Sequence, residues 1–138
     1  MNALRVVGLL VGGVVVAGAG VGSLIQYASA RAPEKRNPFE GSDGARRAGA
    51  KLYARECAAC HGAAREGGGH IPPLEQPEVY GATPGALFWV LRNGSLHRGM
   101  PSFAHLPEAE RWQIITFLQS AEKGRVVWRG GGGFTGGE

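Results

Sequence analysis

The chain has 138 residues, a formal net charge of +4 and two cysteines. This length allows about one compact domain, and two cysteines only two residues apart do not make a disulfide framework. The small basic excess, with no run of lysine or arginine, gives no indication of nucleic-acid binding.

Residues 1–30 predict a single transmembrane anchor. Residues 6–25 carry no charged side chain, and a helix of that length crosses a hydrocarbon core of about 30 Å. Small side chains, with one valine among them, recur at spacings of four and three and predict contact with a membrane-embedded partner subunit. They are Gly8, Gly12, Val15, Ala19 and Gly22. The alternative is an export signal, uncleaved or cut after Ala28-Ser29-Ala30.

The rest of the chain predicts a linker, an all-α domain and a tail. Residues 31–42 contain two prolines and mixed charges, which favours an extended linker. Residues 43–124 predict three main helices: one that starts at Ser42 or Asp43 and runs to about residue 57, one from 84 to 93, and one from 107 to about 121. No strand pattern competes with them, and residues 125–138 form a glycine-rich tail.

The segment Cys57-Ala58-Ala59-Cys60-His61 matches the attachment motif of c-type haem. On a helical turn, two thiols separated by two residues reach the same porphyrin edge, and each adds across one vinyl group. His61 then lies under the iron. A thioredoxin-like pair would need a βαβ setting, and a zinc site would need a second pair of ligands; neither is found in the sequence.

From about residue 43 to 121 the chain resembles the class I cytochrome c family. A small and an aromatic residue, Gly49 and Tyr53, precede Cys57 by eight and four residues, as on the first helix of that family. Leu-Arg-Asn-Gly at 91–94, followed by Gly-Met-Pro at 99–101, resembles the segment that presents the second iron ligand. Ile114 and Phe117 stand where the last helix of the family crosses the first.

The resemblance implies a small helical domain wrapped around one covalent haem c, with His61 and Met100 as the iron ligands. Gly99 and Pro101 would restrain the loop of Met100. The alternative for Met100 is a gap-filling core residue, and the rival ligands are His97 and His105.

Further residues are expected around the cofactor. The carbonyl that orients His61 belongs to Pro72 or Pro73, and the Pro-x-Leu pattern formed with Leu74 favours Pro72. The aromatic residues Trp89 and Phe103 are expected in the core that holds the haem. Arg92 and Arg98 meet haem propionates or an acidic partner, or are solvated surface charges.

Two protein ligands leave the iron no open position, so the expected function is one-electron transfer between redox protein partners, without enzymatic activity or a small-molecule substrate. The family implies a domain in the periplasm, and the predicted anchor would tether it to the bacterial cytoplasmic membrane. Three hypotheses are open: a tethered carrier, a haem subunit of a membrane-bound dehydrogenase or other redox complex, and a haem sensor or catalytic haem protein with a labile sixth ligand.

Overall fold

A computed structural model describes residues 20–32 and 35–129, with side chains as far as Ser120. The elements are the helices α1 (Val21–Ser29), α2 (Asp43–Glu56), α3 (Ala58–His61), α4 (Pro77–Tyr80), α5 (Pro84–Asn93) and α6 (Glu108–Arg129), and the 3-10 turn η2 (Leu96–Arg98). In these ranges the only strand-like pairings are two isolated bridges, Gly68–Ile71 and Ser95–Met100. The predicted all-α class is confirmed.

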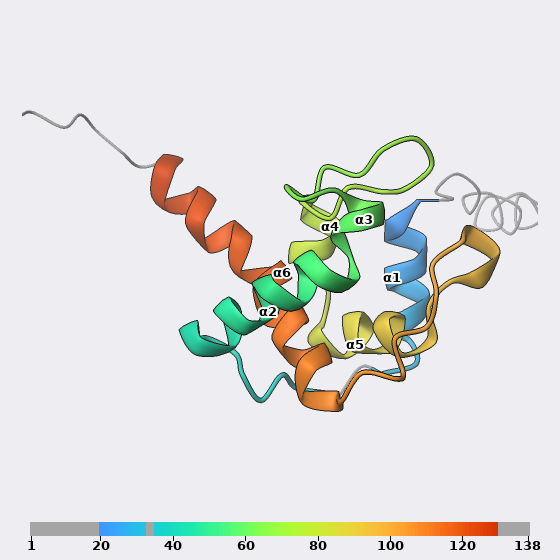
Figure 1. Ribbon diagram of the computed structural model, residues 1–138, viewed down its shortest axis with the longest axis horizontal. Helices are drawn as coiled ribbons and strands as arrows, with labels where there is room; N and C mark the ends of the chain where they lie inside the picture. The colour runs from blue at the N-terminus through green and yellow to red at the C-terminus, as the bar shows by residue number, and fades with distance from the viewer. Residues whose placement is uncertain (1–19, 33–34, 130–138) are drawn as a thin grey trace, which may run out of the picture.

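The crossing of α2 and α6 is the main helix packing of the domain (Figure 1). Of the two residues predicted for the start of this helix, Ser42 rather than Asp43 caps α2: its hydroxyl accepts a hydrogen bond from the Ala45 N–H at 3.2 Å. At the crossing, a Cβ on Gly49 would lie 1.9 Å from the Gln113 carbonyl oxygen, so only glycine permits this approach. The Tyr53 and Phe117 rings lie 5.4 Å apart beside it. The predicted contact between the first and last helices of the domain is confirmed.

The ends of α5 follow from its sequence. Thr83 accepts a hydrogen bond from the Ala86 N–H at 3.2 Å, and Pro84 occupies the first turn, where no N–H is needed. Gly94 ends the helix with a φ of 66°. Six of its ten residues are buried, and α5 therefore contributes a nearly continuous apolar surface to the core.

The last helix is longer than the sequence predicts. α6 continues to Arg129, past the expected end near residue 121. The residues after 121 include no proline, and an isolated glycine such as Gly124 is tolerated within a helix at a cost of about 1 kcal/mol. Residues 130–138 of the predicted tail lie outside the described residues.

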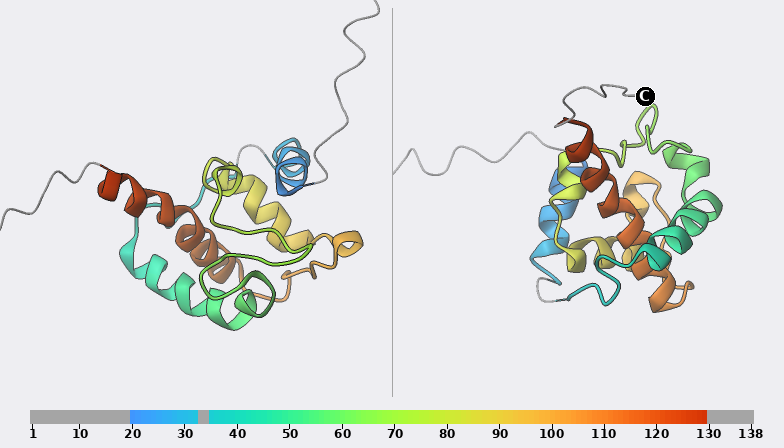
Figure 2. Two further views of the ribbon diagram at one scale, coloured as in Figure 1. Left: turned by 90° about the horizontal axis from the view of Figure 1, so that it is seen from above. Right: turned by 90° about the vertical axis from the view of Figure 1, so that its left-hand side faces the viewer.

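The described part of the predicted anchor is a helix that packs on the domain. α1 lies beside α5 and α4 (Figures 1 and 2), with Ile25 only 8% exposed and Ala28 completely buried. None of the helices in the described ranges is long and apolar enough to cross a membrane. Residues 1–19, which include most of the predicted span and four residues of its small stripe, lie outside these ranges.

The described residues of the predicted linker also contact the domain. The Lys35 ammonium lies 3.0 Å from the Glu108 carboxylate and 3.9 Å from the centre of the Phe88 ring. This ammonium lowers the pKa of Glu108 by hydrogen bonding. The buried Asn37 side chain donates to the Thr116 hydroxyl at 2.9 Å.

We expect Asn37→Ala to lower the free energy of unfolding by about 1–3 kcal/mol, because it removes a buried hydrogen bond to Thr116 and the acceptor of the Phe39 N–H. Denaturant titration of the haem-loaded protein measures this change. The matched control is Asn93→Ala, whose exposed side chain bonds only to its own helix; its effect should stay within about 0.5 kcal/mol. Equal changes in the free energy of unfolding for the two variants would show that the Asn37–Thr116 hydrogen bond does not stabilise the domain.

Candidate haem-binding site

Both cysteines of the attachment motif border one apolar cavity. Cys57 ends α2, where its N–H donates to the Tyr53 carbonyl at 2.9 Å, and the single turn of α3 then carries Cys60 and His61. Both thiols are free; Cys57 is buried and Cys60 is exposed. Burial raises the pKa of the Cys57 thiol to about 12, with a further increase from Glu56. The Cys57 thiol is therefore neutral at physiological pH.

His61 is oriented by a backbone carbonyl. Its Nδ1 lies 3.0 Å from the Pro72 oxygen. A carbonyl oxygen only accepts, so Nδ1 carries the proton and Nε2 keeps a free lone pair. Pro72, rather than Pro73, is thus the residue in contact with the imidazole. An imidazole that ligates a metal through Nε2 needs this tautomer, with its proton on Nδ1.

Tyr53 holds the residue that follows His61. Its hydroxyl donates to the Gly62 carbonyl at 2.7 Å, and burial raises the pKa of Tyr53 to about 12. The hydroxyl therefore stays protonated, and able to donate, throughout the physiological pH range. An aromatic residue four positions before Cys57 thus fixes the far end of the motif as well as filling the core.

The loop of Met100 is pinned to the end of α5. The Ser95 N–H donates to the Met100 carbonyl at 2.9 Å, and the Met100 N–H donates to the Ser95 carbonyl at 3.1 Å. Gly99 has a φ of 81°, in the left-handed region that favours glycine. At Gly94, a Cβ would come within 2.6 Å of the Pro101 backbone. The two glycines therefore allow a tight loop that presents Met100 to the cavity.

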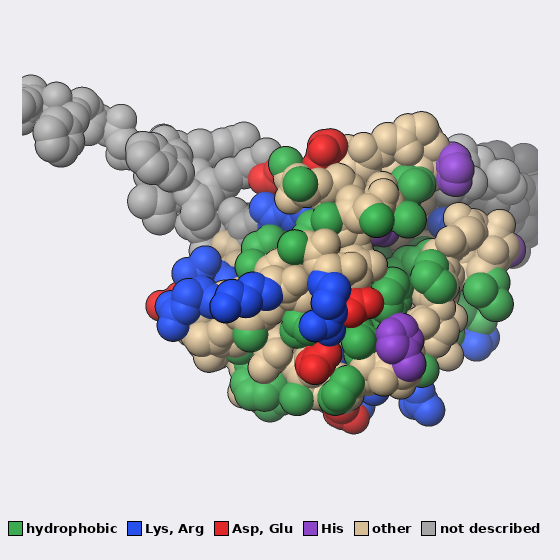
Figure 3. All heavy atoms as spheres, viewed as in Figure 1, with side chains coloured by type: hydrophobic (Ala, Val, Ile, Leu, Met, Phe, Trp, Pro, Cys, Tyr) green, Lys and Arg blue, Asp and Glu red, His purple; other side chains and the backbone are tan. Residues whose placement is uncertain are grey.

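His61 and Met100 both border this cavity of about 500 Å³, which we call the haem cavity. Its other lining residues are mostly apolar and include Leu74, Leu87, Val90, Leu91, Phe103, Ile114 and Leu118. Hydrophobic side chains gather at the centre and right of the molecular face in Figure 3, while Lys and Arg side chains gather over α2. The structure thus brings together seven of the eight predicted site residues: Cys57, Cys60, His61, Pro72, Leu74, Met100 and Phe103.

Trp89 is the predicted site residue that lies elsewhere. It is not among the residues that border the haem cavity. Its ring instead meets the Tyr27 ring of α1 edge-on, with the ring centres 5.4 Å apart. The rival ligands His97 and His105 are both exposed, on and after the turn η2.

Three cavity residues from α1 were not predicted: Val21, Leu24 and Ile25. The sequence carries a signal for them. Together with Ala28 they fall at helical spacing on one side, whereas Ser23 and Gln26 fall between them. A membrane span needs no such polar face, so this pattern is typical of a helix that covers a core.

The haem cavity suits a haem c by its chemistry. Two thiols, an imidazole with a free Nε2 and a thioether surround an apolar space that a porphyrin would fill. The buried Ser95 hydroxyl also borders the cavity and has no hydrogen-bond partner among the described residues. Since buried polar groups are almost always satisfied, this hydroxyl indicates a ligand that brings a polar atom, as the propionates of haem do.

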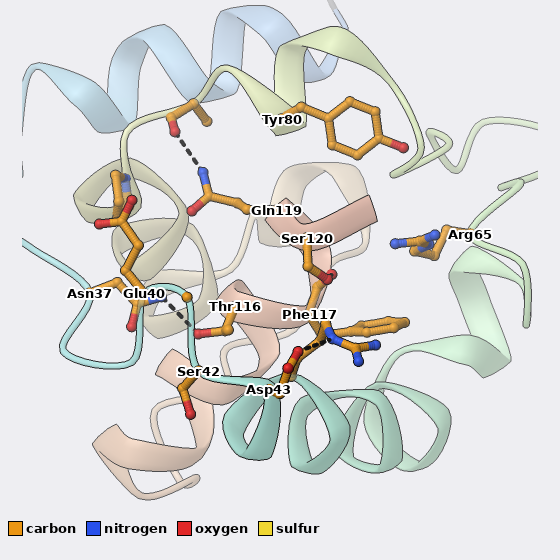
Figure 4. Close-up of a pocket in the computed structure, with 14 residues that line it drawn as sticks. Asn37, Glu40, Ser42, Asp43, Arg65, Tyr80, Thr116, Phe117, Gln119 and Ser120 are labelled. Carbon is orange, nitrogen blue, oxygen red and sulfur yellow. Dashed lines mark hydrogen bonds and ion pairs between the residues drawn. The ribbon is translucent and has the colours of Figure 1, made fainter. Parts of the chain in front are cut away.

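A second cavity, of about 780 Å³, has a different character (Figure 4). Several polar side chains on its wall are paired with the protein: Gln119 donates to the Ala82 carbonyl at 2.8 Å, and Asn37 donates to the Thr116 hydroxyl. The Arg65 guanidinium lies 4.9 Å from the centre of the Phe117 ring. None of the predicted site residues borders this cavity.

The family of cytochrome c oxidase, cbb3-type, subunit III matches residues 44–118, more than half of the chain. The chain belongs to this family. It is therefore a class I c-type cytochrome, and the family implies haem c as cofactor and electron transfer as activity. Comparison with curated proteins and with solved structures gave no match.

The matched range covers only part of the cytochrome described above. It includes the haem motif, the loop of Met100 and most of the crossing of α2 with α6. It excludes α1 and residues 31–42. One wall of the haem cavity therefore comes from a segment outside the family match.

Proposed function

We propose that this cytochrome transfers single electrons between redox proteins on the periplasmic side of a bacterial membrane, with Cys57 and Cys60 attaching one haem c and with His61 and Met100 as its axial ligands. The observation that carries the proposal is the convergence of these four side chains on one apolar cavity. Bound there, a haem c supplies an iron that gains and loses one electron.

The protein residues determine what chemistry the site permits. His61, held by the Pro72 carbonyl, and Met100, held by its loop, would both ligate the iron of a bound haem. With both of these ligands bound, the iron would have no position for oxygen or a substrate, which favours electron transfer over catalysis or gas sensing. The neutral thioether of Met100 favours ferrous iron and raises the reduction potential.

A fixed subunit is the second candidate form of this function. The family description names a subunit of a terminal oxidase, and the packing of α1 and the Asn37–Thr116 bond shorten the free tether that a shuttling carrier would use. We infer that the cytochrome stays close to its anchor and serves partners within a membrane complex. Detergent extraction and identification of co-purifying redox subunits tests this form.

We expect the full chain, matured in bacteria that attach haem c, to carry one haem through two thioether bonds. Each S–H adds across a vinyl double bond without releasing an atom, so the mass of the loaded chain should be that of chain plus haem. Intact-protein mass spectrometry and haem staining of denaturing gels measure this. The double variant Cys57→Ala/Cys60→Ala should lose all stain.

Single variants serve as matched controls for the attachment. Cys57→Ala and Cys60→Ala should each leave one thioether bond and one unreacted vinyl group, visible as a shifted pyridine haemochrome spectrum. A wild-type chain that carries no covalent haem, or a double variant that still stains, would contradict the proposed function.

A further inference from the structure

Helix α1 has one face turned to the haem cavity and another turned to solvent. Val21, Leu24 and Ile25 border the cavity that also holds His61 and Met100. Ser23 and Gln26, on either side of Leu24 and Ile25 in the sequence, are exposed. α1 therefore closes the cavity with three aliphatic side chains.

The N-terminal end of α1 is fastened to the loop of Met100. The Arg98 guanidinium donates to the Gly20 carbonyl at 2.9 Å and to the Ser23 hydroxyl at 3.4 Å. Arg98, one residue before Gly99, thus links the start of α1 to the loop that presents the predicted iron ligand. Neither a haem propionate nor an acidic partner is needed to explain its position.

The middle of α1 is held by close packing. Tyr27 meets Trp89 of α5 edge-on. A Cβ on Gly22 would lie 3.6 Å from the Glu78 side chain of α4, so this member of the small-residue stripe faces the domain. The helix is therefore in contact with two neighbouring elements.

The chain after α1 is equally close to the domain. A Cβ on Gly85 would lie 1.9 Å from the Ala32 carbonyl oxygen, so a glycine in α5 makes room for this segment. Lys35 then reaches Glu108 and Phe88. The Asn37 side chain bonds to Thr116, as Figure 4 shows. The chain is thus in contact with the domain both before and after residues 33–34, from Gly20 to Asn37.

We infer that α1, the C-terminal part of the predicted anchor, forms one wall of the haem cavity. The inference rests on the proposed function, since it assigns Val21, Leu24 and Ile25 to cofactor binding. Their aliphatic side chains exclude water from one side of the cavity, which favours the less charged ferrous state. The same packing fixes the cytochrome directly beside its anchor.

Two aspartate substitutions on adjacent residues of α1 test the inference. In haem-loaded full-length protein in detergent, Ile25→Asp should lower the midpoint potential, because a carboxylate in the cavity stabilises ferric iron. Gln26→Asp adds the same charge on the exposed face, where water and salt screen it. We expect the first shift to be several-fold larger. Measurement at alkaline pH keeps the buried carboxyl ionised even though burial raises its pKa.

A third variant covers the case that Ile25→Asp does not fold. Gly85→Ala leaves every cavity residue unchanged, yet its Cβ collides with Ala32 and should displace α1. The potential should fall in this variant as well. Unchanged potential in Gly85→Ala, or equal shifts for Ile25→Asp and Gln26→Asp, would overturn the inference.

The mature N-terminus gives an independent check. Signal cleavage after Ala30 would remove the whole of α1, so mass spectrometry should find a mature chain that retains residues 21–29. A mature chain that begins at Arg31 would overturn the inference. A wild-type chain without haem would instead refute the proposed function, and the two failures are thereby distinguishable.

Discussion

Gly49→Leu should destabilise the haem-loaded protein by at least about 1–3 kcal/mol, the range typical of overpacking. Even the first added carbon would lie 1.9 Å from the Gln113 carbonyl oxygen and 2.9 Å from the Phe117 Cβ. A helix backbone cannot move aside as a flexible side chain can, so α2 and α6 must separate along their crossing. Thermal and denaturant unfolding of the loaded protein measure the loss.

Gly44→Leu is the matched control, because it makes the same substitution on the same helix. A Cβ on Gly44 would have only the Ser42 hydroxyl near it, at 3.8 Å. The change should therefore be neutral or slightly stabilising, since leucine favours a helix over glycine by up to about 1 kcal/mol. Similar unfolding curves for the two variants would show that close packing at Gly49 is not needed.

The parts of the fold that the sequence predicts well are those governed by local rules. Ser42 and Thr83 are side-chain caps, and Pro84 and Gly94 delimit α5 at the predicted residues. The approach of α2 to α6 at Gly49 was also predictable, because the first helix of class I cytochromes c carries a small residue eight positions before the first haem cysteine, where the last helix crosses it. Motif and capping chemistry act over a few residues and can be read from them.

The parts that the sequence does not predict depend on tertiary contacts. The uncharged run of residues 6–25, which ends within α1, satisfies the length criterion of a membrane span, and that criterion does not distinguish a lipid-facing side chain from one that faces a protein core. Trp89 has a large aromatic side chain of the kind that lines a haem cavity, but its position on α5 places it against Tyr27. The Pro72 carbonyl, by contrast, lies at His61 Nδ1 as the Pro-x-Leu pattern favours, and the folded loop shows why Pro73 is not the partner.

Met100→Ala should remove the proposed sixth ligand without disturbing the loop that carries it. The two hydrogen bonds between Ser95 and Met100 are made by backbone atoms, and Gly99 sets the turn, so truncating the thioether leaves the loop intact. The weak sulfur-to-iron band of the oxidised protein in the near infrared should disappear. The reduced variant should bind carbon monoxide, which the wild-type protein should not. The potential should also fall, by about 120 mV if the thioether prefers ferrous iron a hundredfold, at about 59 mV for each factor of ten.

Alanine variants of the rival ligands complete the test of Met100. His97 and His105 are exposed, so His97→Ala and His105→Ala should keep both the near-infrared band and the wild-type potential. If either variant abolished low-spin ligation while Met100→Ala preserved it, the assignment of Met100 would be wrong. A wild-type spectrum of a haem with two histidine ligands would have the same consequence. Carbon monoxide binding by the wild-type protein would instead indicate a labile sixth ligand, which favours the sensor or catalytic hypothesis over electron transfer. The near-infrared band identifies the sixth ligand, whereas carbon monoxide binding by the wild-type protein decides between electron transfer and the sensor or catalytic hypothesis.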